Sequence, residues 1–243
     1  MKKSILHGTI TILFLILFGV IHFGIWPTIA SAEQKVIKWK LQGTFGTGSL
    51  EYKYWCELFT KRVEEASAGR LKITAYPAGS LVGTMQLFDS VSKGAIDICQ
   101  QWGAYLGGKD PAFILESVAP LGWQTPMQAL GWIYNGGGLE LERELYGKYN
   151  VHYVGPLVGN HSAPWGGLFL KDKAAHKIAD LKGLKLRSSG ADAKLLTQVG
   201  VATVSLPGEE SYLALERGTI DGAEYWSPYH NANMGMHQIV KNS

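Results

Sequence analysis

Two stretches of the chain, FDSVSKGAIDICQQWGAY at residues 88–105 and YLALERGTIDGAEYWSPY at residues 212–229, align without a gap. Both contain a basic residue followed by glycine, then Ile-Asp, and later a tryptophan and a tyrosine at matching positions. The glycine suits the C-terminal end of a helix, where a positive φ is needed. The residues after it predict a strand, with the tryptophan and tyrosine just beyond the strand's carboxyl end. The sequence therefore predicts two similar helix–strand units.

Strands and helices also alternate in the prediction for the rest of the chain. Strands are expected at residues 36–41, 71–76 and 96–100, with helices at 50–66 and 84–93 between them. Such alternation is typical of an α/β fold in which helices flank a mostly parallel sheet. Further on, the pattern predicts helices at 127–134, 139–149 and 191–199, and strands at 151–157, 167–170 and 183–187.

The repeated stretches indicate where a ligand would bind. Open α/β sheets bind ligands in the crevice outside the carboxyl ends of their strands. Trp102 and Tyr105 of the first copy and Trp226 of the second copy fall there. Two such units with aromatic walls facing each other would form a two-domain clamp that closes by hinge motion, as periplasmic binding proteins do. The alternative is that the two units share geometry without sharing a ligand.

The N-terminus has the pattern of an export signal. A positive end precedes an apolar run at residues 10–20, and Ala30-Ser31-Ala32 supplies the small residues that a signal peptidase accepts. We expect residues 1–32 to be a signal peptide cleaved near Ala32, which places the mature protein in the periplasm. The alternative is an uncleaved membrane anchor, because apolar character continues beyond the run.

The exported part of the chain is expected to form two α/β domains. The predicted strand at 151–157 precedes a loop and then a new series of strands, so the crossing between domains is expected near Leu157. This gives an N-terminal domain at residues 33–156 and a second, incomplete domain at residues 157–243.

After export, the two cysteines, Cys56 and Cys99, would lie in an oxidising compartment, where a pair of cysteines can form a disulfide. Cys56 is expected in an amphipathic helix and Cys99 at the end of a strand. Two buried, inert thiols are therefore the alternative.

Composition fits a folded exported protein and argues against a nucleic-acid-binding one. The 243 residues are 46% hydrophobic and 18% charged, which is enough for a sizeable core. From Glu33 onward 21 basic side chains stand against 20 acidic ones, because Lys2 and Lys3 account for two of the 23 in the chain. Scattered basic residues at a net charge of +1 give no basis for nucleic-acid binding. The Trp-rich composition permits a homodimer.

The sequence contains no recognised catalytic or transition-metal motif. It has no nucleophile elbow, no Walker loop, no C-x-x-C and no H-E-x-x-H. The glycine-rich stretch at residues 43–48 has the spacing G-x-x-G-x-G, which suits either flexible backbone near a ligand or a plain turn. Glu209 and Glu210 suit the first turn of a helix. We therefore expect no enzyme and no required cofactor.

Arg187 stands out as a ligand-binding side chain. It ends the predicted strand at 183–187, and Ser188-Ser189-Gly190 leads from it into the next helix. A guanidinium at a strand's carboxyl end is well suited to bidentate pairing with a carboxylate. Lys185 shares the alternation of Arg187, so the alternative places both side chains in solvent on an edge strand.

Four stretches carry a resemblance to a known family: WIYNGGGLELERELYGKYNVHYVGPLVGN (132–160), WGGLFLK (165–171), LKGLKLRSSG (181–190) and GTIDGAEYWSPY (218–229). Together they resemble the solute-binding proteins of tripartite ATP-independent periplasmic (TRAP) transporters, most closely the 2-oxo-acid and lactate branch. The resemblance covers nearly all of the exported chain. It implies an extracytoplasmic receptor that closes two α/β domains on a small organic acid and delivers it to a membrane permease.

The resemblance also implies roles for single residues. The family's arginine after the G-x-K-[IL] strand clamps the substrate carboxylate, and it matches Arg187. In the oxo-acid branch the glutamate of the D-G-A-E turn and the carbonyl of the next residue hold a cation; they match Glu224 and Tyr225. Tyr105 matches a tyrosine that reaches the ligand.

Glu224 raises a question of charge. A carboxylate opposite an arginine would repel an acid ligand unless a cation lay between them, so Glu224 is expected to bind Na⁺ or Ca²⁺. The alternative is a structural salt bridge between Glu224 and Arg187. The chain departs from the branch at Pro164, where a glutamine usually completes the cation shell. Asn160 or Ser162 would have to substitute for it, or the cation is absent.

Family members continue well beyond Ser243, so the sequence is expected to be a fragment or a truncated form. The leading hypothesis is a protein that binds a 2-oxo or 2-hydroxy monocarboxylate without catalysis. One alternative is a receptor that presents its ligand to a membrane sensor. Another is an exported hydrolase that uses Glu224 as an acid or base.

Overall fold

The computed structural model describes residues 35–117, 123, 125–156, 167–225 and 227–241. It separates Met1–Lys35 from a unit that spans Val36–Ser243, to which all elements below belong. The predicted signal peptide and the expected domain crossing near Leu157 lie outside the described residues and stay predictions. No helix in the described part of the chain has both the length and the apolar character needed to cross a bilayer.

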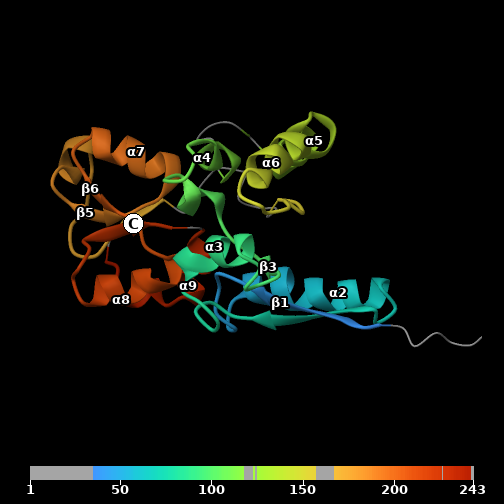
Figure 1. The fold of residues 1–243 in the computed structure, drawn as a ribbon. Coiled ribbons are helices and arrows are strands. Elements are labelled where there is room, and N and C mark those ends of the chain that lie inside the picture. Colours follow the sequence, from blue (N-terminus) through green and yellow to red (C-terminus); the bar gives the residue numbers. More distant parts are fainter. Residues whose placement is uncertain (1–34, 118–122, 124, 157–166, 226, 242–243) are drawn as a thin grey trace, which may run out of the picture. The chain divides into compact units, whose positions relative to one another are not determined.

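The first sheet is three-stranded and parallel. Its strands are β1 (Ile37–Gln42), β2 (Leu71–Tyr76) and β3 (Ile98–Cys99), in the order β2-β1-β3 (Figure 1). The first crossover is a π-helical segment at Tyr52–Leu58 that continues into α2 (Phe59–Ala66). The second consists of a 3-10 turn at Thr84–Gln86 and α3 (Leu87–Ser92). The helices and strands predicted for this region are therefore confirmed, with shorter bounds for the third strand.

The second sheet has four strands, namely β4 (Leu168–Leu170), β5 (Lys185–Arg187), β6 (Ala202–Val204) and β7 (Gly222–Glu224). Their order is β4-β7-β5-β6; β5 runs parallel to both of its neighbours, and β4 runs antiparallel to β7. The helical segments of this region are Ile178–Leu181, α7 (Gly190–Gln198), Gly208–Glu210, α8 (Ser211–Glu216), α9 (Pro228–Asn233) and Met236–Gln238. The prediction of mostly parallel sheets flanked by helices is confirmed.

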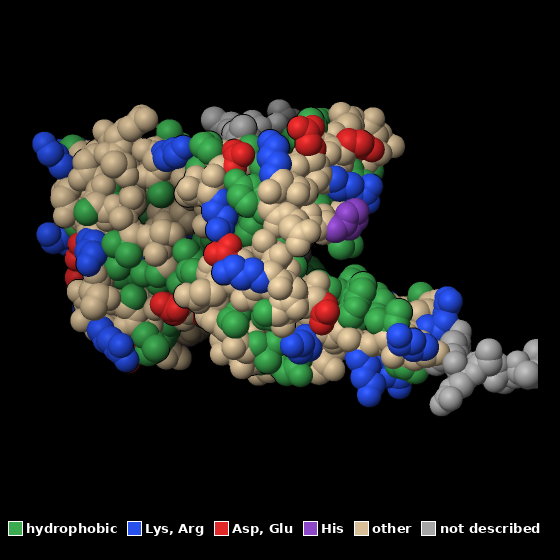
Figure 2. All heavy atoms as spheres, viewed as in Figure 1, with side chains coloured by type: hydrophobic (Ala, Val, Ile, Leu, Met, Phe, Trp, Pro, Cys, Tyr) green, Lys and Arg blue, Asp and Glu red, His purple; other side chains and the backbone are tan. Residues whose placement is uncertain are grey.

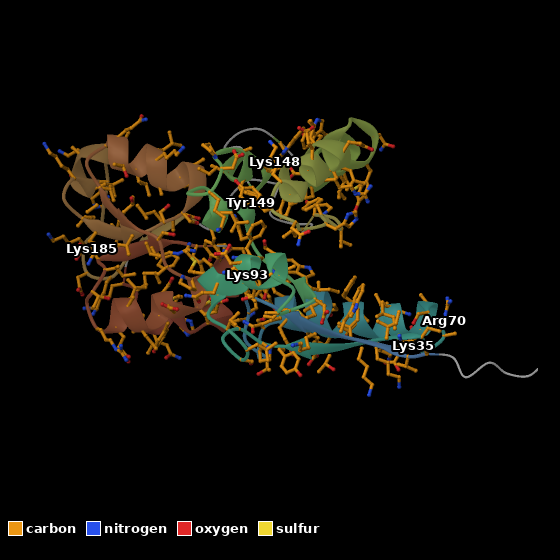
Figure 3. The ribbon with its side chains drawn as sticks, viewed as in Figure 1. Lys35, Arg70, Lys93, Lys148, Tyr149 and Lys185 are labelled. Atoms are coloured by element: carbon orange, nitrogen blue, oxygen red, sulfur yellow. The ribbon has the colours of Figure 1, made fainter. Side chains whose placement is uncertain are left out.

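Helices dominate the described residues between the two sheets. A 3-10 turn at Gly103–Leu106 precedes α4 (Ala112–Ser117), α5 (Pro126–Asn135) and α6 (Gly138–Gly147). The turn after α6 is tied to the end of α3, because the Ser92 hydroxyl donates a 2.6 Å hydrogen bond to the carbonyl of Tyr149. Figure 3 shows Tyr149 and Lys93 at this junction.

The predicted repeat has a common structural cause. In both copies the helix ends at a glycine with positive φ, Gly94 at 72° after α3 and Gly218 at 68° after α8. In both copies the following residues form a strand that lies beside the neighbouring strand in parallel, β3 against β1 and β7 against β5.

The aspartate of each Ile-Asp pair has the same hydrogen-bonding role in both copies of the repeat. The backbone N–H of Lys40 in β1 donates to the carboxylate of Asp97 at 2.8 Å. The backbone N–H of Lys185 in β5 donates to the carboxylate of Asp221 at 2.7 Å. Each aspartate thus satisfies a backbone donor one residue before the ladder between the two strands begins, at Leu41 in β1 and at Leu186 in β5.

The prediction of a strand at residues 151–157 is wrong for its described part. Residues 151–156 form no strand with any described residues. The alternating pattern is real, since Tyr153 is buried and Val151 half-buried while His152 and Val154 are exposed. The inward side chains pack on a cluster of aromatic and aliphatic residues that includes Phe113. Alternation therefore reflects packing on helices and not pairing with a strand.

Leu186 in β5 offers a direct test of the second core. Its side chain is fully buried against Leu170, Leu184 and Val201. We expect Leu186→Ala to lower the free energy of unfolding by about 2–5 kcal/mol in chemical denaturation, because the cavity adds to the lost burial. Leu195→Ala on α7, where the leucine is 52% exposed, is the matched control and should change it by less than about 0.5 kcal/mol. Equal effects at both positions would contradict the packing.

Both cysteines are free thiols in the structure, Cys56 buried and Cys99 half-buried. Burial raises the pKa of Cys56 to about 12 and that of Cys99 to about 12. Since a thiol reacts as its thiolate, these values fit the alternative of two inert thiols.

Basic side chains do not form one patch on the face that Figure 2 displays. There, Lys and Arg are scattered among hydrophobic, acidic and other groups.

Candidate ligand-binding site

Arg187 ends β5, which is an internal strand between β6 and β7. Its side chain is 3% exposed, whereas Lys185 at the other end of the strand is exposed (Figure 3). The alternative of a solvated edge strand is therefore wrong. A buried guanidinium must find partners, because an isolated buried charge is very unfavourable.

The guanidinium of Arg187 is held by three oxygen acceptors. Its Nε donates to the carbonyl of Leu206 at 3.1 Å, Nη1 to the carbonyl of Glu224 at 2.7 Å and Nη2 to the hydroxyl of Tyr105 at 3.1 Å. The ring of Tyr225 lies 4.9 Å from the guanidinium carbon. A guanidinium has five N–H groups, so these hydrogen bonds fix its orientation and leave one donor on each terminal nitrogen for another acceptor.

The carboxylate of Glu224 makes a looser contact than the predicted alternative of a salt bridge implies. Its Oε2 lies 3.9 Å from Nη1 of Arg187 and accepts a hydrogen bond from the Ser188 hydroxyl at 3.3 Å. The short bond from Arg187 goes to the main-chain carbonyl instead. Burial raises the pKa of Glu224 to about 7 even though Arg187 acts to lower it. The negative charge of the Glu224 carboxylate is therefore only partly balanced by its neighbours.

The main-chain carbonyl of Tyr225, the second predicted cation ligand, already accepts a hydrogen bond. The donor is the side-chain amide of Asn231 on α9, at 2.6 Å. Asn231 is buried, and sequence reasoning did not single it out. Since a carbonyl has two lone pairs, this bond leaves Tyr225 able to accept a second contact.

Tyr105 and Trp102 are the remaining predicted residues that the structure describes. The Tyr105 hydroxyl contacts Arg187, and burial raises the pKa of Tyr105 although the neighbouring Arg187 acts to lower it. Trp102 lines the same pocket as Arg187. Asn160 and Trp226 lie outside the described residues, so their predicted roles stay predictions.

A small pocket joins these groups, and its free volume is about 20 Å³, about enough for one water molecule. An organic acid therefore needs the walls to move apart. The lining residues are Trp102, Ala104, Ile114, Arg187, Ser189, Gly190, Ala191, Asp192, Glu224 and Tyr225.

Asp192 is a second carboxylate in the pocket and was missed from the sequence. It lies in the first turn of α7, five residues after Arg187, and its charge acts to raise the pKa of Glu224. Gly190 at φ 62° turns the chain so that the start of α7 borders the pocket. No alternating or helical pattern marks such a position; only the turn geometry brings it there.

The donor set fits a hard cation better than a transition metal. The described residues contain no group of three or more His, Cys, Asp or Glu side chains arranged to hold a metal ion. The pocket instead offers the carboxylates of Glu224 and Asp192 together with the Ser189 hydroxyl. Oxygen donors of this kind suit Na⁺ or Ca²⁺.

Comparison with known proteins gives a consistent assignment. The family described as "Bacterial extracellular solute-binding protein, family 7" matches residues 43–243. The monocarboxylate 2-oxoacid-binding periplasmic protein of Nostoc sp. strain PCC 7120 is 36% identical over 205 residues, which is 84% of this chain and 55% of that protein. This chain therefore spans only about half of that relative's length.

Two solved structures agree in fold. A TRAP periplasmic solute-binding protein from Pseudoalteromonas atlantica T6c, with bound sodium and pyruvate, has a TM-score of 0.73 at 30% identity, covering 85% of this chain and 61% of that one. A TRAP transporter solute-binding protein from Bordetella bronchiseptica RB50, described as a dimer with calcium and picolinate in one site, has a TM-score of 0.71 at 30% identity and covers 85% and 60%. The two-domain clamp expected from the sequence is the fold of these proteins. The chain belongs to the bacterial extracellular solute-binding protein family 7, the DctP-like solute-binding proteins of TRAP transporters.

Proposed function

We propose that this protein is the extracytoplasmic solute-binding component of a TRAP transporter, that it binds a 2-oxo or 2-hydroxy monocarboxylate, and that it delivers this acid to a membrane permease. The observation that carries the proposal is the buried guanidinium of Arg187, which is oriented by three hydrogen bonds and borders a pocket. A fixed guanidinium is the side chain best matched to a carboxylate.

Arg187 clamps the ligand's carboxylate, and the aromatic residues form the walls around it. Tyr105 of the first copy of the repeat contacts the guanidinium, and Trp102 of the same copy lines its pocket. We infer the same kind of role for Trp226 from its matching position in the second copy. Asn160 contributes a polar contact. Support for the ligand class comes from the relatives, of which one is named for monocarboxylate 2-oxoacids and another holds pyruvate.

A cation bridges the ligand and the carboxylate of Glu224. Arg187, Glu224 and Asp192 carry one positive and two negative formal charges in one pocket. A monocarboxylate adds another negative charge, which Ca²⁺ balances fully and Na⁺ only in part. The cation is therefore held by Glu224, Asp192 and the carbonyl of Tyr225, with Ca²⁺ preferred over Na⁺. Sodium and calcium each accompany the ligand in one of the two solved relatives.

The proposal extends to location and assembly. The export signal at residues 1–32 is cleaved near Ala32, and the mature periplasmic protein consists of α/β domains at 33–156 and 157–243. It binds no nucleic acid and catalyses no reaction. A homodimer agrees with the description of the Bordetella bronchiseptica relative as a dimer.

Titration calorimetry with pyruvate and lactate tests this function. We expect binding that is tightest in Ca²⁺, weaker in Na⁺ and weakest with a chelator in potassium buffer. Glu224→Gln and Asp192→Asn should each reduce the gain from Ca²⁺ by at least about tenfold, because each removes one charge from the site. Asp172→Asn, at an exposed carboxylate that pairs with Lys241, is the matched control and should keep the full gain.

Each contrary result has a definite meaning. Equal affinity in Ca²⁺ and in chelator would refute the bridging cation while leaving the clamp intact. Failure of every tested acid to bind in any buffer would refute the proposed function. Turnover of ester or glycoside substrates that depends on Glu224 would establish the hydrolase alternative instead.

A further inference from the structure

A buried pair of a histidine and a carboxylate joins two distant parts of the chain away from Arg187. Nδ1 of His230 lies 2.9 Å from Oε1 of Glu51, and the two side chains are 5% and 13% exposed. Glu51 directly precedes the helix that follows β1, whereas His230 is in α9, 179 positions later. The pair therefore connects the part that builds the three-stranded sheet with the part that follows the four-stranded sheet.

Aromatic rings from both parts surround the imidazole. The ring of Phe45, in the loop after β1, meets it edge-on at 5.8 Å between centroids. The ring of Tyr225, just after β7, meets it edge-on at 5.4 Å. A histidine packed between rings from two parts can keep its place only while those parts remain together.

The charges near His230 favour the pair. Burial acts to raise the pKa of Glu51, but the hydrogen bond to His230, a backbone hydrogen bond and the charge of His230 together lower it. Glu209 is the other carboxylate whose pKa the charge of His230 affects, and burial raises the pKa of Glu209 to about 7. A pair that is removed from water needs its partner, because either group left alone in the interior is strongly destabilising.

The pair is also linked to the ligand site through Tyr225. The same tyrosine ring contacts His230 on one side and the guanidinium of Arg187 at 4.9 Å. Glu51 and His230 further border a cavity of about 270 Å³ whose lining residues come from both parts. Movement at His230 would therefore reach Arg187 through the ring of Tyr225.

We propose that Glu51 and His230 form a latch that holds the two parts of the molecule closed and positions Tyr225 beneath Arg187. The latch rests on the proposed function only for its effect on ligand affinity; its effect on closure does not need a ligand. His230 is a positioning residue here, because it acts on the ligand through Tyr225 and Arg187.

Two readouts on a set of variants test the latch. Small-angle X-ray scattering gives the radius of gyration without ligand, and calorimetry gives the affinity for pyruvate in Ca²⁺. We expect Glu51→Leu and His230→Phe, which keep approximate size, each to raise the radius of gyration and to weaken pyruvate binding at least about tenfold. The double variant should restore most of the original radius of gyration and most of the pyruvate affinity, since an apolar pair of similar volume can replace a buried ion pair. Glu64→Gln is the matched control, because its ion pair with Lys72 is exposed, and it should change neither readout.

The outcomes separate the latch from the proposed function. Single variants that lose thermal stability but keep both affinity and radius of gyration would overturn the latch, because the pair would then be only structural. An unchanged radius in the single variants would overturn it as well. If the unaltered protein binds no carboxylate, the proposed function fails, and the scattering comparison still decides for or against the latch.

Discussion

Arg187→Ala abolishes measurable binding of pyruvate or lactate in calorimetry, with an expected loss of affinity on the order of 10² to 10³-fold. The reason is that truncating one side of a buried, hydrogen-bonded charge pair costs about 2–5 kcal/mol. Arg187 is 3% exposed, so water cannot replace it next to the ligand. Arg187→Lys keeps the charge without the planar pair of donors and should bind with intermediate affinity.

The controls for Arg187 separate binding from folding. Arg217→Ala removes the same side chain at an exposed position after α8, and it should leave affinity unchanged. Arg187→Ala also leaves Glu224 without its nearest cation, so thermal unfolding of each variant must accompany the calorimetry. A folded Arg187→Ala protein that keeps its affinity would show that the carboxylate is clamped elsewhere.

Gly208→Ala is expected to disable the site by displacing the ring of Tyr225. A Cβ atom at Gly208 would fall on the ring of Tyr225, which is 5% exposed and packs against both Arg187 and His230. The ring must leave its position, and overpacking of this kind costs about 1–3 kcal/mol of stability. Because Tyr225 supports Arg187, we expect ligand affinity to fall at least about tenfold in calorimetry.

Gly131→Ala is the matched control for this steric effect. Gly131 is exposed within α5, and a Cβ atom there meets nothing within 4 Å. Alanine is favoured over glycine inside a helix by about 1 kcal/mol, so this variant should be at least as stable as the original. If Gly208→Ala binds ligand as tightly as Gly131→Ala does, Tyr225 has no supporting role.

The sequence predicted the repeat and the sheets well because these depend on neighbours along the chain. Gly94 and Gly218 end helices, and the aspartates that follow them hydrogen-bond to adjacent strands in the same way. Such local rules leave a recognisable spacing. Residues 151–156 show the limit, because alternation there came from packing against helices and not from a strand.

The candidate site was predicted only in part, and the missed residues share one property. Arg187 and Tyr105 were expected at strand ends, and Glu224 and Tyr225 from the family resemblance; the structure brings these residues together. Asp192 depends instead on the turn at Gly190, and the Glu51–His230 pair depends on which segments meet in three dimensions. No periodicity marks them.

The hydroxyl of Tyr105 accepts a hydrogen bond from the guanidinium of Arg187, so it competes with a ligand for that donor. A molecule that bound in place of the Tyr105 hydroxyl, and not on the donors left on the terminal nitrogens, would exchange one hydrogen bond for another and gain only the difference. An alcohol or amide gains almost nothing by replacing a phenol, whereas a carboxylate gains the extra strength of a bond between opposite charges. In the proposed receptor, such an exchange would favour carboxylates over neutral molecules without a steric barrier.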